Sequence, residues 1–124
     1  MLTFDEEDAV WTLRHKDVVI RSATDIERWR ELLTAELTKI KTIGADLLIS
    51  LDGFTLDPSL AEAYGRVAKA AVGGGNFGSV IRYGAETDMT TTAIRLGAVL
   101  SRFPSNIFPD RRHALAALQK VRTL

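Results

Sequence analysis

GADLLISLDGFTLDPSLAEAY, residues 44–64, is the stretch that predicts the fold of this chain. A nearly continuous apolar run from Leu47 to Leu51 favours a strand that is covered on both faces. Asp57 stands where an N-cap is expected, and Pro58 occupies the first helical position, where its missing N–H costs nothing. Because open α/β sheets place their sites at the carboxyl ends of strands, we expect the functional site in the loop from Asp52 to Ser59.

Composition narrows the class of protein. A chain of 124 residues, 46% hydrophobic and 26% charged, is typical of one globular domain, which we place at residues 1–124. Sixteen basic residues balance sixteen acidic ones. The chain therefore lacks the net positive charge that generally attracts a nucleic-acid-binding protein to the phosphate backbone. No apolar run approaches the roughly 20 residues of a membrane span. The acidic start resembles no secretion signal and the chain has no cysteine, so we expect a cytoplasmic protein.

The charges are unevenly distributed along the chain. Residues 5–8 are all acidic, whereas basic residues outnumber acidic ones near the end, at Arg102, Arg111, Arg112, Lys120 and Arg122. We interpret both groups as solvated faces, with a steering surface for a charged partner as the alternative.

The first part of the chain predicts strands and then a helix. Residues 2–14 indicate two short strands joined by a polar turn, and residues 17–22 indicate a third. Thr24 and Glu27 match a capping box, so a helix is expected over residues 25–41. Its apolar residues recur at helical spacing: Ile26, Trp29, Leu33, Leu37 and Ile40.

The second part repeats a helix and a strand. The helix after Asp57 is expected to end in the glycine run at 73–75, and a strand follows over residues 79–83. A turn at 84–87 leads into a helix that Pro104 stops, with Met89, Ala93, Leu96, Leu100 and Phe103 at helical spacing. Residues 106–108 form a minimal strand, and Asp110 caps a last helix whose apolar residues are Ala114, Leu115, Leu118 and Val121. This order predicts an α/β domain with a mixed central sheet and four helices packed on it.

This order resembles the STAS domain, which bacterial anti-sigma factor antagonists share with the cytoplasmic tails of sulfate transporters. LLISLDGFTLDPSLAEAY is similar to the family's core strand, its Asp-containing turn and the Asp-Ser-Ser/Thr-Gly start of its second helix. FPSNIFPDRRHALAAL resembles its closing strand and last helix. Asp57 matches the motif's aspartate and Ser59 one of its hydroxyl positions, whereas Pro58 replaces the other hydroxyl and Leu60 the glycine.

The resemblance implies a non-enzymatic regulatory module that binds a protein partner. Its partner would be a serine kinase of the anti-sigma type or a larger signalling assembly, and it would dock on the loop 52–59 and the start of the second helix. Ser59 would be the phosphoacceptor and Asp57 its cap and neighbour, with Phe54 as the contact residue and Thr55 and Asp52 beside them. No cofactor is implied.

Other interpretations use the same residues. Asp52 could serve as an acid or base in a small α/β enzyme or ligand-binding domain with a crevice at the strand end. Phe54 either packs under the loop or is an exposed aromatic anchor. A homodimer could form by pairing of an exposed sheet edge. His15 and His113 lack metal-ligand spacing and are interpreted as surface or cap residues, so no metal is expected.

Overall fold

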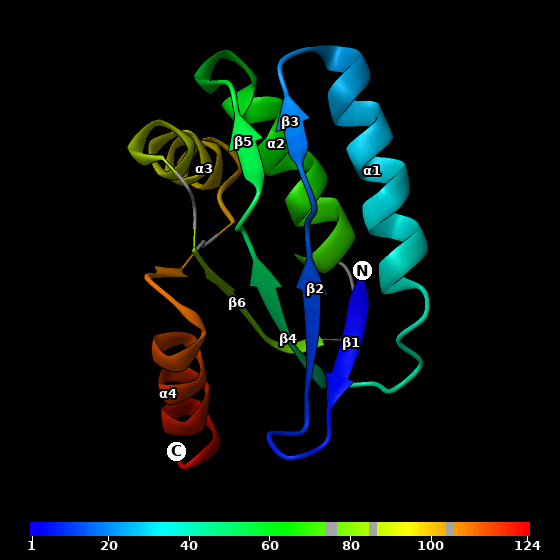
Figure 1. Ribbon diagram of the computed structural model, residues 1–124, viewed down its shortest axis with the longest axis vertical. Helices are drawn as coiled ribbons and strands as arrows, with labels where there is room; N and C mark the ends of the chain where they lie inside the picture. Colours follow the sequence, from blue (N-terminus) through cyan, green and yellow to red (C-terminus); the bar gives the residue numbers. More distant parts are fainter. Residues whose placement is uncertain (74–76, 85–86, 104–105) are drawn as a thin grey trace.

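The computed structural model describes residues 1–73, 77–84, 87–103 and 106–124. Within these ranges the predicted α/β class and mixed sheet are confirmed (Figure 1). The five-stranded sheet has the order β1-β2-β4-β6-β7, in which β1 is antiparallel to β2 and the other pairs are parallel. Its strands are β1 (Leu2–Asp5), β2 (Val10–Arg14), β4 (Ala45–Ser50), β6 (Phe77–Tyr83) and β7 (Ile107–Phe108). The four α-helices of the described residues are α1 (Ala23–Leu37), α2 (Ala61–Ala68), α3 (Asp88–Ser101) and α4 (Arg111–Arg122).

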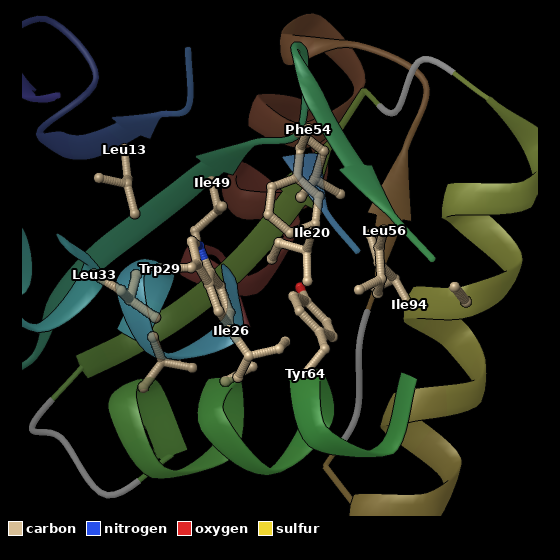
Figure 2. Packing of buried hydrophobic residues seen from close by; sticks show 14 of the residues in the cluster. Leu13, Ile20, Ile26, Trp29, Leu33, Ile49, Phe54, Leu56, Tyr64 and Ile94 are labelled. Atoms are coloured by element: carbon tan, nitrogen blue, oxygen red, sulfur yellow. The ribbon is translucent and has the colours of Figure 1, made fainter. Parts of the chain in front are cut away.

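The central strand β4 is buried on both faces, as its apolar run predicts. Leu47 and Ile49 belong to the core that α1 and α2 cover, and Leu48 belongs to a second core under α4. Figure 2 shows Ile49 among the side chains of the first core. Helices on both faces of a largely parallel sheet remove its apolar surface from water, which is the main stabilising contribution to such a fold.

A small second sheet extends the first one. β3 (Val18–Ile20) pairs in parallel with β5 (Phe54–Leu56). Figure 1 shows β3 continuing the line of β2, and β5 that of β4, beyond the carboxyl ends of the larger sheet. The expected loop from Asp52 to Ser59 therefore contains a strand. It leads into a 3-10 turn, η1 (Pro58–Leu60), and then into α2, which continues as a π-helical turn, η2 (Lys69–Gly73).

The start and end of α1 differ from the prediction. Its N-cap is Ser22, whose hydroxyl accepts from the Asp25 backbone N–H at 3.2 Å, while the Asp25 carboxylate accepts from the Arg21 N–H at 2.9 Å. The predicted capping box at Thr24 was wrong because Ser22, two residues earlier, already has the extended backbone of a cap. The helix ends at Leu37 rather than residue 41. Its predicted buried stripe is confirmed at Ile26, Trp29, Leu33 and Leu37.

The predicted apolar face of α3 is confirmed at Ala93 and wrong for most of its other residues. Met89, Leu96 and Leu100 are exposed, and beside Ala93 the helix buries Thr90, Ile94, Gly97 and Ser101. The reason is the close packing of α2 on α3, since a Cβ added at Gly97 would lie inside van der Waals distance of the Ala61 carbonyl oxygen. Small residues let the two backbones approach, so the large apolar side chains of α3 point elsewhere.

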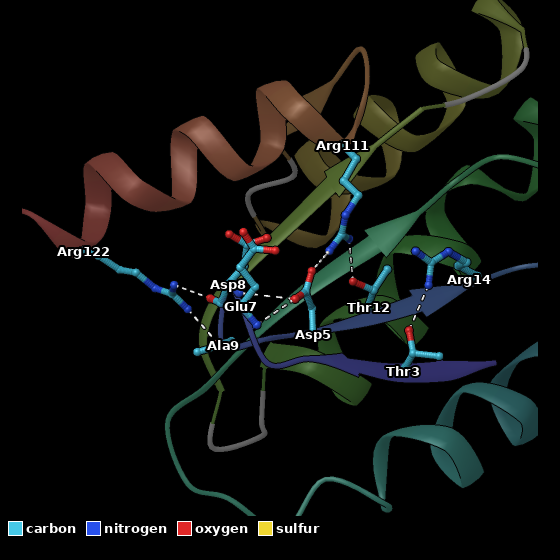
Figure 3. A network of polar contacts seen from close by, with 9 residues as sticks. All are labelled: Thr3, Asp5, Glu7, Asp8, Ala9, Thr12, Arg14, Arg111 and Arg122. Atoms are coloured by element: carbon cyan, nitrogen blue, oxygen red, sulfur yellow. Dashed lines mark hydrogen bonds and ion pairs between the residues drawn. The ribbon is translucent and has the colours of Figure 1, made fainter.

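The helix α4 begins as predicted and joins the two ends of the chain. Asp110 caps it by accepting from the His113 N–H at 2.9 Å, and Ala114 and Leu118 are buried, although Val121 is exposed. Figure 3 shows two of its arginines meeting the acidic first turn. Arg111 pairs with Asp5 at 3.0 Å, and Arg122 pairs with Asp46 at 2.8 Å and donates to two backbone carbonyls of that turn. Asp5, Arg111 and Arg122, three of the nine charged residues interpreted as solvated faces, thus link the two ends of the chain to the rest of the fold.

Three predicted features fall wholly or partly outside the described residues. These are the glycine run at 73–75, the turn at 84–87 and the helix stop at Pro104.

Candidate functional site

Phe54 lies in the core rather than on the surface. Its side chain is 0% exposed and packs among His15, Trp29 and Tyr64, with ring centroids 4.9, 5.8 and 5.7 Å away. Figure 2 shows Phe54 with Trp29 and Tyr64. The expectation that Phe54 contacts a partner is therefore corrected, and the alternative that it packs under the loop holds. Side chains along β5 point alternately to opposite faces of the strand. Phe54 and Leu56 are therefore buried on the same face, and Thr55 between them faces outward.

Asp57 and Ser59 meet at the start of the second helix. One Asp57 carboxylate oxygen accepts from the Ser59 backbone N–H at 2.9 Å and from the Ser59 hydroxyl at 2.8 Å. These bonds, the backbone one first, lower the pKa of the Asp57 carboxyl below its ordinary value. Pro58 follows the cap as predicted, and Ser59 is exposed. The predicted cap is confirmed, and it leaves the Ser59 hydroxyl open to solvent.

The surroundings of this turn include a cation that the sequence interpretation missed. Arg21 is exposed at the end of β3, next to Asp57, whose backbone N–H donates to the Ile20 carbonyl at 3.0 Å. The charge of Arg21 also contributes to the lowered pKa of Asp57. We call Arg21, Thr55, Asp57, Pro58 and Ser59 the β5 tip. It combines an exposed hydroxyl, a carboxylate and a guanidinium at the ends of the two paired strands β3 and β5.

A buried threonine holds the strand of the β5 tip in place. Thr90, 0% exposed on α3, accepts from the Leu56 backbone N–H at 3.3 Å through its hydroxyl. The same hydroxyl lies 3.0 Å from that of Thr87, the N-cap of α3. A bond between a helix and a strand 34 residues away leaves no local signal in the sequence.

Asp52 does not join the other candidate residues. It is exposed at the carboxyl end of β4, with its carboxylate against Gly84. Gly53 and the three residues of β5 lie between it and Asp57, so the two carboxylates stand before and after the strand. Two hollows of about 530 and 630 Å³ lie on other parts of the surface, lined by residues of the helices and their connections. The structure therefore brings Asp57 and Ser59 together and leaves Asp52 apart.

His15 is more constrained than a surface histidine. It is half-buried, and its two ring nitrogens lie 2.8 Å from the Ser50 carbonyl and 3.1 Å from the Trp29 indole nitrogen. Because an indole N–H only donates, Nε2 of His15 must accept and Nδ1 must carry the proton that it donates to Ser50. Burial lowers the pKa of the His15 ring, which the hydrogen bond to Ser50 opposes. This network stands directly behind Phe54.

No helix in the described ranges has the length and apolarity needed to span a bilayer, and no cluster of three or more potential metal ligands occurs among the same residues. Comparison of the chain with protein-family models, with curated proteins and with solved structures gave no match.

Proposed function

We propose that this chain is a non-enzymatic interaction module, resembling the STAS domains of anti-sigma factor antagonists, which docks a protein partner through the β5 tip and the start of α2. The observation that carries the proposal is the Ser59 hydroxyl, exposed at the start of the second helix and hydrogen-bonded to the Asp57 carboxylate at 2.8 Å. The STAS resemblance assigns the phosphoacceptor to this position. The order of strands and helices along the chain agrees with it.

Phosphorylation of Ser59 would change both the charge and the shape of the β5 tip. A phosphate adds about −1.5 to −2 charges. Placed on the Ser59 hydroxyl it would repel the Asp57 carboxylate, which now lies 2.8 Å away and also caps the Ser59 backbone N–H. The displaced cap leaves an N–H for the phosphate, and Arg21 supplies a neighbouring cation. A partner that fits the unmodified tip would therefore be released, as expected for a serine kinase of the anti-sigma type or a signalling assembly.

The alternative of a small enzyme or ligand-binding domain at Asp52 has less support. An enzyme needs several polar groups that converge on one concave site. Asp52 is exposed and precedes β5, whereas Asp57 and Ser59 follow it. The second alternative, a homodimer, would pair the outer edge of β1, where Phe4 is 47% exposed, with the same edge of another copy. Sedimentation at increasing protein concentration tests whether the mass rises.

Affinity capture from the native host, with variant baits, tests the proposal. Wild type and Ser59→Ala should retain the same partner, and Ser59→Asp should lose it. Thr92→Asp is the matched control, because Thr92 is an exposed hydroxyl residue on α3 and should leave capture unchanged. Incubation of the captured complex with ATP should phosphorylate wild type at Ser59. Equal capture by all baits would refute the switch, and a partner lost equally with Thr92→Asp would refute the β5 tip as its docking surface.

A further inference from the structure

A groove of about 530 Å³ separates the end of α1 from the end of α2 and η2. Its volume falls within the range of about 300–1,000 Å³ that is typical of small-molecule sites. α1 leads into β4 and η2 precedes β6, so the groove lies at the amino ends of these parallel strands. The β5 tip lies beyond the opposite ends, and the groove is therefore independent of the proposed docking site.

Apolar residues form just over half of the groove's lining, and threonines and basic residues form the rest. Leu37 of α1 is buried, whereas Ile43 is 80% exposed. The apolar side chains that line it are Leu37, Ile40, Ile43, Val67, Ala70, Ala71 and Phe77. An alkyl chain lying here would remove apolar surface from water on both sides, which is favourable by about 25 cal/mol per Å².

The charges around the groove are of one sign. Arg30, Lys41 and Arg66 line it, and no acidic residue of the described chain does. Arg30 is neutralised by its ion pair with Glu27. The side chains of Lys41 and Arg66 form no ion pair or hydrogen bond with any residue that the structure describes. Two uncompensated cations beside an apolar channel complement a ligand with one anionic end and one alkyl end.

We propose that this groove binds a free, unbranched medium-chain carboxylate. The carboxylate lies between Lys41 and Arg66, where charge-assisted hydrogen bonds hold it. The alkyl chain runs between Leu37 and the small residues of η2, Ala70 and Ala71, whose short side chains leave the channel open.

Titration calorimetry with octanoate, 1-octanol and acetate tests the two parts of this site. Octanoate should bind, 1-octanol at least tenfold more weakly because it lacks the charge, and acetate not at all because it lacks the chain. The double variant Lys41→Ala, Arg66→Ala should weaken octanoate at least tenfold. The matched control is Arg28→Ala, Arg95→Ala, which removes two exposed arginines that do not line the groove and should leave the affinity unchanged.

The variant Ala70→Trp distinguishes octanoate binding inside the groove from non-specific attraction of octanoate to surface cations. Ala70 is exposed, so the indole should fill the channel without unfolding the chain, as circular dichroism would check, and should abolish octanoate binding. Octanoate that fails to bind wild type, that binds Ala70→Trp unchanged, or that binds no better than 1-octanol would overturn the proposal.

Discussion

The network of His15 predicts a specific loss of stability in mild acid. Both of its ring nitrogens are committed only when the ring is neutral, with Nδ1 donating to Ser50 and Nε2 accepting from Trp29 at 3.1 Å. A proton on Nε2 would face the indole N–H, leaving two donors opposed and the Trp29 N–H without an acceptor. The N-terminal amine and Arg82 add positive charge near the ring, and both lower the pKa of His15 further.

The magnitude follows from proton linkage. Burial lowers the pKa of His15 in the folded chain, whereas the unfolded chain keeps the ordinary value of 6.5. The unfolded state therefore binds more protons below pH 6.5, so the free energy of unfolding decreases as the pH falls through this range. One proton sets an upper limit of about 1.4 kcal/mol per pH unit on this decrease, which ends once the folded ring also protonates. The carboxyl groups with lowered pKa values, such as Asp5 and Asp57, contribute only nearer their ordinary value of 3.8 and below it.

Urea unfolding between pH 8 and pH 5, followed by tryptophan fluorescence, measures this slope. We expect constant stability above pH 7.5 and a decline below pH 6.5 that His15→Gln removes. His113→Gln is the control, because it removes the other histidine, which is exposed on α4. A flat profile in wild type, or a decline that persists in His15→Gln and disappears in His113→Gln, would refute the role given to the buried ring.

Two further predictions concern packing and the joined termini. Gly97→Ala should destabilise the fold by about 1–2 kcal/mol, although alanine is the better helix former, because its Cβ would strike the Ala61 carbonyl and force α2 from α3; increased stability in a urea melt would contradict the close packing. Arg111→Leu should cost about 1–3 kcal/mol by leaving the hydroxyl of Thr12, which is 1% exposed, without its 2.7 Å donor. Thr12→Val in the same chain should then cost less than in wild type, and strictly additive losses would exclude the coupling.

The elements that the sequence predicted correctly are those with local causes. The apolar run of β4 needs only its own residues to indicate burial on both faces, and Asp57 followed by Pro58 forms a cap through groups two residues apart. The last helix was located for the same reason, since Asp110 caps it through His113. A cap or a continuous apolar strand can therefore be recognised without knowing the tertiary structure.

The errors arose where tertiary packing decides. Leu96 and Leu100 at helical spacing indicate a buried face, yet α3 turns Gly97 toward α2 because the contact of two backbones excludes bulky side chains. The same limit applies to the candidate site. Nothing near His15 or Phe54 in the sequence shows that their rings meet, because β2, β5 and α1 bring them together from distant segments. The spacing of apolar residues within one helix does not show which other element that helix will pack against.

The second helix connects the two proposed sites and also makes them separable. It follows η1, which contains Ser59 of the β5 tip, and its last turn carries Arg66 and leads into the π turn that borders the groove. Between them Tyr64 stacks on Trp29 with ring centroids 4.9 Å apart, so the middle of the helix is fixed in the core (Figure 2). A substitution at either end therefore alters one surface without repacking the other. Ser59→Asp should abolish partner capture and leave octanoate affinity unchanged. The double variant Lys41→Ala, Arg66→Ala should weaken octanoate binding and leave partner capture unchanged.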